Sequence, residues 1–473
     1  MPTNGKGRTA RQRTRKKTQN PKNFVAQEIY YDLLKSMKRE FGFKNKSLAP
    51  FVFKDTGRGM MAKTRICEGD VILSIPQAAM VGVNSAFNLS KFAQSISSVY
   101  HSMHDGLKLS GIQILCIFLI EEKRKLGKNK PSSTWGYYVK VLPQTFTHPL
   151  YWEMEEIHTL PKQLQICVNK TIDCVKQQFK ELNEMIKKLK LGSDLNYHEE
   201  ISWIEYRWAW CCVNTRCVYS THDDPTVMKC CYQSSAADKY FLVPYLDLLN
   251  HSNEVNTKAE FNNTNKCFEL RTHCKFKRFT QVFISYGALS NSTLLVEYGF
   301  VCKTPNKHDV VALDVGHVLS FIKYSVKTAI CPSNSLLNQL KKYDLDKGLA
   351  FTIHGPSWTL IQCVVLAVMT CNMNNNQISK ICLQLMQKSI SMNEFPNAVN
   401  SLTTATQILQ NLCAELTKAT QERMKQCRSM NNTSHIELVL KLWQIHLEIL
   451  ETSLQEISTK KIINVCFNDC DEK

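Results

Sequence analysis

The apolar positions of this chain change their spacing several times, and each change predicts a new element. Between Phe24 and Phe43 they recur at helical intervals, which predicts an amphipathic helix that ends near Gly42. Two β-rich runs follow, around 51–53 and 71–75. Between them, Gly57-Arg-Gly59 predicts a tight turn in which the backbone can approach a ligand closely.

The central and C-terminal patterns are mostly helical. Residues 84–200 are predicted to be mainly helical, and the lysines along Pro161–Leu191 are typical of a solvated helix face. Residues 201–303 return to short strands and turns, and helical spacing resumes after 304. The last helix is predicted to bury one apolar seam, made of Ile436, Leu440, Trp443, Leu447, Leu450, Leu454 and Ile457. We expect this seam to pack within its own domain rather than in a coiled-coil dimer, since it covers only about three heptads.

The stretch Phe241–Ser252 carries the clearest candidate chemistry. Its apolar run ends against Asp247, Asn250 and His251, and such a polar cluster at the end of a strand is typical of a site held on a rigid element. A metal site is not indicated, because the 20 cysteines form no C-x-x-C framework. We expect these cysteines to be free or buried thiols in a reducing compartment.

Length and charge refine this picture. A chain of 473 residues predicts two or more domains, and a net charge of +18 favours acidic partners or a nuclear setting. Residues 1–23 have no apolar periodicity and are predicted to be a disordered basic tail, whose cations are Lys6, Arg8, Arg11, Arg13, Arg15, Lys16, Lys17 and Lys22. We interpret this tail as a site for a nuclear-import receptor, rather than as a direct nucleic-acid site or a merely solvated tail. The expected location is the nucleus and cytoplasm. No membrane association is expected, because no secretory signal follows the basic residues and the apolar runs are short.

Six short motifs gain meaning from their order. They are TGRGMMA (56–62), WGYYVKVLP (135–143), NTR (214–216), PYLDLLNHS (244–252), FISYG (283–287) and EYGF (297–300). The glycine turn alone lacks the full G-x-G-x-x-G of a dinucleotide site, and an isolated Asn-His pair is also what a core histidine would give. Together, the motifs resemble those of SET-domain methyltransferases of the branch that contains the plant Rubisco large-subunit lysine methyltransferase.

The resemblance implies an α+β fold. A β-rich SET domain of small sheets, with a pseudoknot, would be split by a helical insertion and followed by an all-α substrate-binding domain. The implied order is a disordered tail (1–23), an N-terminal helix (24–46), the first SET part (47–83), the insertion (84–200), the second SET part (201–303) and the helical domain (304–473).

The resemblance also implies S-adenosyl-L-methionine as cofactor and assigns residues to it. Asn250 and His251 would contact its amino-acid and adenine parts, and Thr215 and Arg216 would hold its carboxylate, for which a guanidinium fork is suited. The remaining implied contacts are Gly57, Arg58, Gly59, Met60, Tyr286, Phe300 and Asp247. For Asp247, the capping of a turn is an equal alternative.

Two tyrosines are the implied catalytic residues. Tyr286 would orient the accepting nitrogen beside the methyl group, while Tyr298 and Phe300 would form the walls of a lysine channel. Because lysine is protonated at neutral pH, with an unperturbed pKa of about 10.4, the site must favour the neutral amine. Ordinary core packing is the alternative for either tyrosine taken alone.

Two departures from related enzymes bear on the substrate. No cysteine cluster for zinc follows Phe300, which weakens an analogy with zinc-capped histone enzymes. Cys217 and Val218 follow the motif arginine, where a histidine-modifying member of the branch has a polar residue, and they suit an aliphatic lysine stem better. We therefore expect lysine methylation of a histone tail or of another lysine-bearing protein. Protein-histidine methylation and a catalytically silent adaptor remain the alternatives.

Overall fold

The chain folds into two compact units whose segments alternate along the sequence. The computed structural model describes residues 21–100, 109–126, 131, 133–192, 200–221, 232–233, 239–302, 306–325, 334–370, 373, 375–387, 398–431, 433–459, 462 and 464. Unit 1 consists of Met1–Pro143, Leu189–Asn196 and Arg216–Ser285, and unit 2 consists of Gln144–Lys188, Tyr197–Thr215 and Tyr286–Lys473. Within the described ranges, no helix is both long and apolar enough to cross a bilayer.

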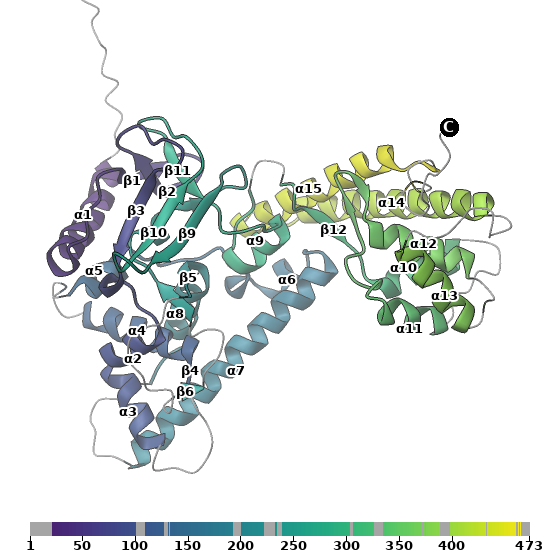
Figure 1. Cartoon of the computed structure of the whole chain (residues 1–473). Coiled ribbons are helices and arrows are strands. Elements are labelled where there is room, and N and C mark those ends of the chain that lie inside the picture. The colour runs from purple at the N-terminus through teal and green to yellow at the C-terminus, as the bar shows by residue number, and fades with distance from the viewer. Residues whose placement is uncertain are drawn as a thin grey trace, which may run out of the picture. The chain divides into compact units, whose positions relative to one another are not determined.

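Two small sheets form the centre of unit 1 (Figure 1). The first has the order β1-β2-β11-β8 and contains β1 (Leu48–Phe53), β2 (Gly57–Ala62), β11 (Gln281–Ile284) and β8 (Asn250–His251). The second has the order β3-β10-β9 and contains β3 (Val71–Pro76), β10 (Cys267–Thr272) and β9 (Thr257–Asn262). Strands β8 and β11 run parallel, with Ile284 opposite His251. This pairing holds the polar end of the 241–252 stretch against the first sheet.

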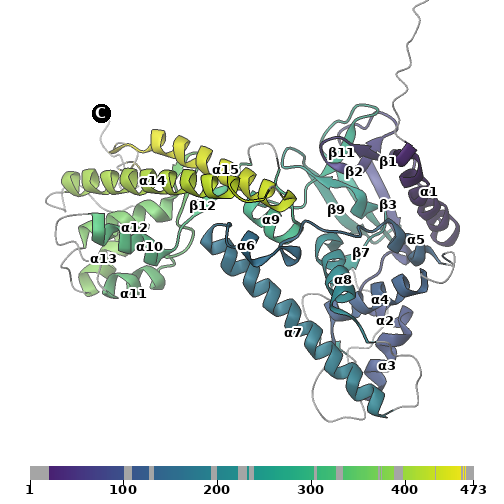
Figure 2. The same ribbon diagram turned by 180° about the vertical axis from the view of Figure 1, so that it is seen from behind.

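Helices pack beside these sheets in unit 1. Helix α1 (Pro21–Phe41) packs on α5 (Thr134–Val141) and contacts β1, as Figure 2 shows from behind. Helix α5 packs on α4 (Gly111–Leu126), which contacts α2 (Val83–Leu89) and α3 (Lys91–Tyr100). Smaller elements complete the unit: η1 (Gln77–Ala79), η4 (Leu246–Leu248), β4 (Leu109–Ser110) paired with β6 (Tyr232–Gln233), and β5 (Cys217–Tyr219) paired with β7 (Tyr240–Leu242).

Unit 2 is mainly helical in the residues that the structure describes. Its first part contains η2 (Pro149–Tyr151), α6 (Met154–Ile157), α7 (Lys162–Gly192) as far as Lys188, α8 (Trp203–Arg216) as far as Thr215, and α9 (Asn291–Tyr298). Its second part contains α10 (Val315–Ser325), α11 (Asn334–Lys342), α12 (Trp358–Met369), α13 (Asn375–Met386), α14 (Ala398–Arg428) and α15 (Ser434–Glu456). One three-stranded sheet, β12 (Val310–Ala312), β13 (Ala350–Thr352) and β14 (Gly355–Pro356), packs against α15.

The strongly periodic helices are confirmed. The predicted helices at 24–43, 109–126, 161–191 and 436–457 are α1, α4, α7 and α15. For the predicted disordered tail, residues 1–20 lie outside the described residues, and the prediction is wrong for Pro21–Asn23 because α1 begins at Pro21.

Three local predictions are wrong. The chain reverses at residues 54–56 rather than at Gly57–Gly59, because Gly57 adopts φ +66° and starts β2 opposite Phe53. Residues 203–216 form helix α8 rather than strands, and its run of buried residues from Trp208 to Val213 has no helical period to detect. The region after 304 is also not purely helical, since β12–β14 form a sheet.

The seam predicted for the last helix is only partly correct. Ile436, Trp443 and Leu450 are buried as expected, but Leu454 is 37% exposed. The buried face also includes the polar residue His446, which an apolar pattern could not reveal. The seam packs inside unit 2, against α14, α9 and the β12–β14 sheet. The predicted domain boundaries stay predictions, because the two compact units do not test them.

Candidate active site

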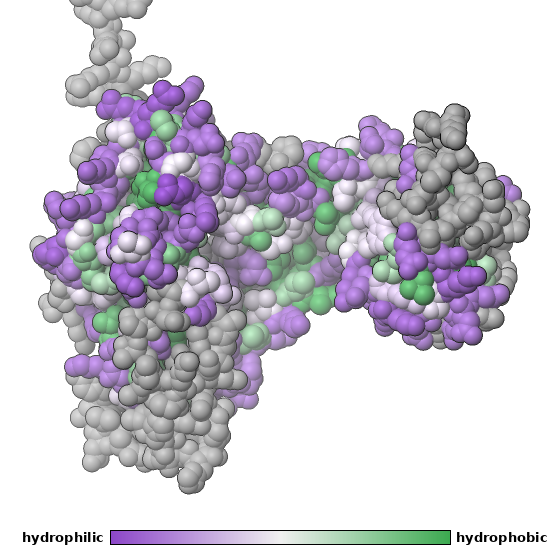
Figure 3. All heavy atoms as spheres, viewed as in Figure 1, coloured by the Kyte–Doolittle hydropathy of each residue, from purple (hydrophilic) through white to green (hydrophobic). Residues whose placement is uncertain are grey.

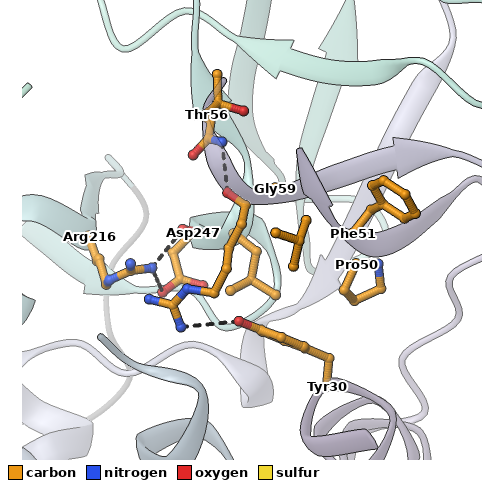
Figure 4. Close-up of a pocket in the computed structure, with 11 residues that line it drawn as sticks. Tyr30, Pro50, Phe51, Thr56, Gly59, Arg216 and Asp247 are labelled. Atoms are coloured by element: carbon orange, nitrogen blue, oxygen red, sulfur yellow. Dashed lines mark hydrogen bonds and ion pairs between the residues drawn. The ribbon is translucent and has the colours of Figure 1, made fainter. Parts of the chain in front are cut away.

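A pocket of about 230 Å³ in unit 1 brings together several of the predicted cofactor residues. Its lining consists of Tyr30, Pro50, Phe51, Val52, Thr56, Arg58, Gly59, Arg216, Asp247, Leu248 and Asn250. Figure 4 shows Arg216 and Asp247 on one side of this pocket and Pro50 and Phe51 on the other. The first sheet, α1 and η4 therefore all contribute to one hollow.

An ion pair at the wall of this pocket is supported from inside the protein. Arg216 Nη1 donates to Asp247 Oδ2 at 3.1 Å and to the Asp247 carbonyl oxygen at 2.8 Å. The Tyr138 hydroxyl donates to the same Oδ2 at 2.9 Å. The side chain of Asp247 is 0% exposed, and burial raises its pKa, while the charge of Arg216 and the hydrogen bond from Tyr138 act to lower it. Burial also raises the pKa of Tyr138 well above its usual value, so this hydroxyl keeps the proton that it donates.

Arg58 is the second guanidinium of the pocket. Its Nη1 donates to the Tyr30 hydroxyl at 3.1 Å and to the Val141 carbonyl at 3.0 Å. Its carbonyl oxygen accepts a hydrogen bond from Asn250 Nδ2 at 2.8 Å, which joins β2 to the start of β8. The charge of Arg58 also acts to lower the pKa of Asp247, so both arginines act on that carboxylate.

Gly59 is required by close approach at the pocket wall. A Cβ atom at this position would lie 2.6 Å from Gln281 Nε2 and 2.9 Å from Asn250 Nδ2. Any larger residue would therefore displace the amide of Asn250 from its contact with Arg58.

The backbone before Asp247 is held in an unusual conformation. Tyr245 has φ +75°, a region that residues other than glycine rarely adopt, and it reverses the chain between β7 and η4. The side chain of Tyr245 is buried, and its hydroxyl accepts a hydrogen bond from Asn45 Nδ2 at 2.6 Å. This anchoring directs the turn that carries Asp247 toward the pocket.

Three predicted cofactor residues of unit 1 are not part of the described pocket lining: Gly57, Met60 and His251. Met60 is fully buried. His251 is buried in β8, and its Nε2 hydrogen-bonds Asn253 Oδ1 at 2.6 Å. Burial lowers the pKa of His251, which favours a neutral ring that supports the motif loop.

The other predicted site residues belong to unit 2. The rings of Tyr286 and Tyr298 are centred 5.1 Å apart, and those of Tyr298 and Phe300 are centred 6.2 Å apart. Such a group of aromatic faces can attract an ammonium group and, by excluding water, lower the pKa of a bound amine. Thr215 donates its hydroxyl to the Cys211 carbonyl at 2.7 Å, a bond within its own helix.

Gly299 fixes the place of Tyr298 and Phe300. It ends α9 in the left-handed conformation, with φ +78°, and its carbonyl oxygen accepts a hydrogen bond from Thr147 at 2.6 Å. A Cβ atom on Gly299 would lie 2.5 Å from the backbone nitrogen of His148. The residue between the two aromatic rings must therefore be glycine.

Sequence reasoning missed two tyrosines, Tyr30 and Tyr138. Tyr138 falls within the aromatic stretch 135–143, but its partner Asp247 lies 109 residues away. Tyr30 occupies a position of helical periodicity in α1, where its ring appears as one more core residue. No residue pattern near either tyrosine indicates the hydrogen-bond partner of its hydroxyl. Among the described residues, no group of three or more His, Cys, Asp or Glu side chains is placed to hold a metal ion.

Comparisons with known proteins agree with this geometry. Residues 57–287 match the family model of the SET domain. SET domain-containing protein 4 of Homo sapiens is 28% identical over 466 residues, which cover 96% of this chain and 98% of that protein. The actin-histidine N-methyltransferase of Danio rerio is 27% identical over 279 residues, which cover 59% of this chain and 43% of that protein.

Solved structures share the fold. The SET domain of LSMT bound to lysine and AdoHcy matches with a TM-score of 0.59 and 16% identity, over 93% of this chain and 92% of that chain. Rubisco LSMT bound to AdoMet matches with a TM-score of 0.54 and 17% identity, over 92% of this chain and 93% of that chain. The predicted fold class, a β-rich SET domain with a helical C-terminal region, is confirmed.

Proposed function

We propose that this chain, which belongs to the SET-domain methyltransferase family, transfers methyl groups from S-adenosyl-L-methionine to lysine side chains of other proteins. The observation that carries the proposal is the pocket of unit 1, where segments distant in sequence bring Arg58, Arg216, Asp247 and Asn250 together. A pocket with two guanidinium groups around one buried carboxylate suits a ligand that carries both a carboxylate and a cation.

The pocket residues fit the amino-acid end of this cofactor. Arg216 and Arg58 would hold its carboxylate, and Asp247 balances part of their charge. Asn250 would line the same end from β8. When bound, the cofactor supplies a methyl group on a sulfonium centre. The similar LSMT structures are bound to AdoHcy or AdoMet, and this supports the choice of ligand.

The aromatic group of unit 2 would receive the acceptor nitrogen. We infer that Tyr286 and Tyr298 orient the amine, and that Phe300 helps to exclude water from it. Desolvation favours the neutral amine, which has the lone pair that the transfer requires. Proximity and orientation of the two reactants would then supply most of the rate.

The decisive test uses labelled cofactor and Tyr286→Phe. The substitution keeps the ring and removes the hydroxyl, so we expect kcat to fall by about 100-fold, while calorimetry should still detect cofactor binding. Tyr219→Phe, an exposed tyrosine on β5, is the matched control and should retain full activity. Undiminished methylation by Tyr286→Phe would refute the catalytic assignment, and absence of cofactor binding by calorimetry would favour an adaptor.

Histidine methylation is the second candidate, because the chain is also similar to actin-histidine N-methyltransferases. The residues that follow Arg216, Cys217 and Val218, have apolar side chains, which favour the aliphatic part of a lysine side chain instead. Mass spectrometry of methylated protein substrates separates the two candidates, and histone and non-histone proteins should both be supplied. A methyl group on imidazole would overturn the lysine assignment.

We also propose that the substrate protein docks in a second hollow, a groove of about 1640 Å³ within unit 2. Its lining comes from the start of α7, from α9, from β12 and α10, and from α14 and α15. Figure 3 shows hydrophobic surface gathered where Figure 1 shows α6, β12 and α15. Thr293 of helix α9 and Ser290, the N-cap of this helix, line the groove, and α9 ends at Tyr298, about 12 Å from Ser290 along the helix axis. About four extended residues of a bound polypeptide would span that length.

Exposed groove residues allow a test that leaves the fold intact. Tyr324 and Ile166 line the groove and are 81% and 61% exposed. We expect Tyr324→Glu and Ile166→Glu to raise KM for a whole protein substrate by about 10-fold, while a short lysine peptide is methylated as before. Ile204→Glu, at a 70% exposed position outside the groove lining, is the control. Unchanged KM in both groove variants would exclude this docking site.

Finally, we propose that the basic residues between 6 and 22 bind a nuclear-import receptor, so that the protein divides between nucleus and cytoplasm. Their dense positive charge, without a nearby acid, supports this proposal. All of them except Lys22, which lies in α1, are outside the described residues. Removal of residues 1–20 should abolish nuclear entry of a fluorescent fusion without changing methylation in vitro, and unchanged entry would exclude the proposal.

A further inference from the structure

The two arginines of the pocket share a feature that the proposed chemistry does not use. Each is held by a tyrosine hydroxyl that comes from a helix rather than from the sheets. Tyr30 of α1 accepts a hydrogen bond from Arg58, and Tyr138 of α5 donates to Asp247, which in turn holds Arg216. Helix α1 precedes the matched SET segment, which starts at residue 57.

We propose that Tyr30 and Tyr138 are positioning residues of the cofactor pocket, which hold the guanidinium groups of Arg58 and Arg216 in the arrangement that binds the cofactor's carboxylate. The inference rests on the proposed function. It adds two residues to which the sequence motifs assign no cofactor contact, and it gives helices α1 and α5 a role in cofactor affinity.

The geometry around Tyr138 favours positioning over simple packing. Tyr138 is fully buried, and its hydroxyl has a specific partner in a carboxylate that is itself 0% exposed. A carboxylate with two donors is fixed in orientation, and it fixes Arg216 through two hydrogen bonds, to Oδ2 and to the carbonyl oxygen. Without the tyrosine, Arg216 would be the one remaining donor to Asp247 Oδ2 among the described residues, so the pair would gain freedom to rotate.

The geometry around Tyr30 is similar but more direct. Tyr30 is 7% exposed and lines the pocket, and its hydroxyl lies 3.1 Å from Arg58 Nη1. The same nitrogen also donates to the Val141 carbonyl at the end of α5. Helices α1 and α5, which pack on each other, therefore both hold the same guanidinium nitrogen. A long arginine side chain loses rotamer freedom on binding, and this loss is smaller when the side chain is already held.

The chain offers a matched control beside each tyrosine. Tyr31 follows Tyr30 in α1 and is 50% exposed, and Tyr137 precedes Tyr138 in α5; neither lines the pocket. The four variants Tyr30→Phe, Tyr138→Phe, Tyr31→Phe and Tyr137→Phe each remove one oxygen atom and keep the ring. The first two remove a hydroxyl that contacts Arg58 or Asp247, and the last two make the same chemical change at a neighbouring position outside the pocket lining.

The experiment measures calorimetric binding of two ligands to the full chain and its variants. S-adenosylmethionine carries the amino-acid carboxylate, and 5′-methylthioadenosine lacks it. We expect Tyr30→Phe and Tyr138→Phe to raise Kd for S-adenosylmethionine by about 10-fold and Kd for methylthioadenosine by less than about 2-fold. Tyr31→Phe and Tyr137→Phe should change neither constant by more than about 2-fold. In the two pocket variants, KM for S-adenosylmethionine should rise by a larger factor than kcat falls.

Each other outcome overturns a defined part of the argument. Equal weakening of both ligands in the pocket variants would mean that the tyrosines support the fold and do not position the arginines. Unchanged affinity of the pocket variants for S-adenosylmethionine would overturn the inference alone. Failure of the unsubstituted chain to bind S-adenosylmethionine would overturn the proposed function, and the inference with it.

Discussion

The pocket of unit 1 and the groove of unit 2 differ in how firmly a buried ionisable side chain is held. In the pocket, the buried Asp247 accepts hydrogen bonds from Arg216 and Tyr138, and Arg58 is held by Tyr30. In the groove, His446 is 6% exposed, yet its Nε2 makes no hydrogen bond to any described residue. Asp247 is therefore held through Oδ2 before a ligand arrives, although its Oδ1 makes no hydrogen bond to a described residue, whereas the imidazole of His446 is not held through Nε2 at all.

Burial has different consequences for the two groups. Asp247 lies beside two guanidinium groups, which act to lower its pKa against the effect of burial. His446 has no such neighbour to oppose burial, which lowers its pKa to about 4. A small charged ligand requires fixed complementary charges, while a polypeptide can bring its own donors and acceptors. This difference suits the two ligands that we propose.

The largest expected effect comes from breaking the buried ion pair. Arg216→Ala would leave Asp247 buried without its cationic partner, so we expect the free energy of unfolding to fall by about 4 kcal/mol. Urea denaturation measures this change. Lys258→Ala breaks the exposed Lys258–Glu260 pair of the same unit, whose side chains are 62% and 55% exposed, and should cost less than about 0.5 kcal/mol. Equal costs for the two variants would show that burial does not distinguish the pairs.

Two glycine substitutions should separate binding from stability. At Gly299, a Cβ would meet the backbone of His148, so we expect Gly299→Ala to lower the free energy of unfolding by about 3 kcal/mol. At Gly59, a Cβ would meet the ends of two side chains, so Gly59→Ala should cost about 1 kcal/mol and instead weaken cofactor binding. Thermal denaturation and calorimetry on both variants provide the measurement. A stability loss at Gly59 as large as that at Gly299 would contradict the contrast.

The pH dependence of stability should reveal the buried histidine. The folded pKa of His446, about 4, lies below its ordinary value of 6.5, so the unfolded chain binds more protons between these values. Stability from this group is complete above pH 6.5 and is lost as pH falls, by about 2 kcal/mol between pH 7 and pH 5. Urea denaturation of the unsubstituted chain and of His446→Leu at both pH values isolates this contribution. An equal pH dependence in the two proteins would contradict the assignment.

The smallest effect concerns the same histidine at a pH where it is neutral. At pH 8, His446→Leu removes a buried polar atom that has no hydrogen bond to a described residue, and it keeps an apolar side chain in its place. We expect the free energy of unfolding to rise by about 1 kcal/mol. A clear loss of stability at this pH would indicate that Nε2 has a partner, and the contrast between pocket and groove would then fail.

The local spacing of apolar residues predicted several helices, because helix formation depends mainly on residues that are close in sequence. The helical spacing of 24–43, 161–191 and 436–457 was sufficient to predict α1, α7 and α15. Helix α8 escaped the same logic, since its apolar residues surround the axis and have no period. The strand start at Gly57 escaped it as well, because a glycine with positive φ fits a turn and the first residue of a strand equally well.

By itself, the sequence determined which side chains are available for the chemistry and in what order they occur, and from these the SET fold and the candidates Arg58, Arg216, Asp247 and Asn250 could be predicted. Only the tertiary structure decided what holds them. The bond from Tyr138 to Asp247 closes a loop of 109 residues, and that from Arg58 to Tyr30 closes one of 28. Such contacts depend on the packing of α1 and α5 beside the sheet, and a hydroxyl on a core-facing tyrosine has no local pattern that reveals its partner.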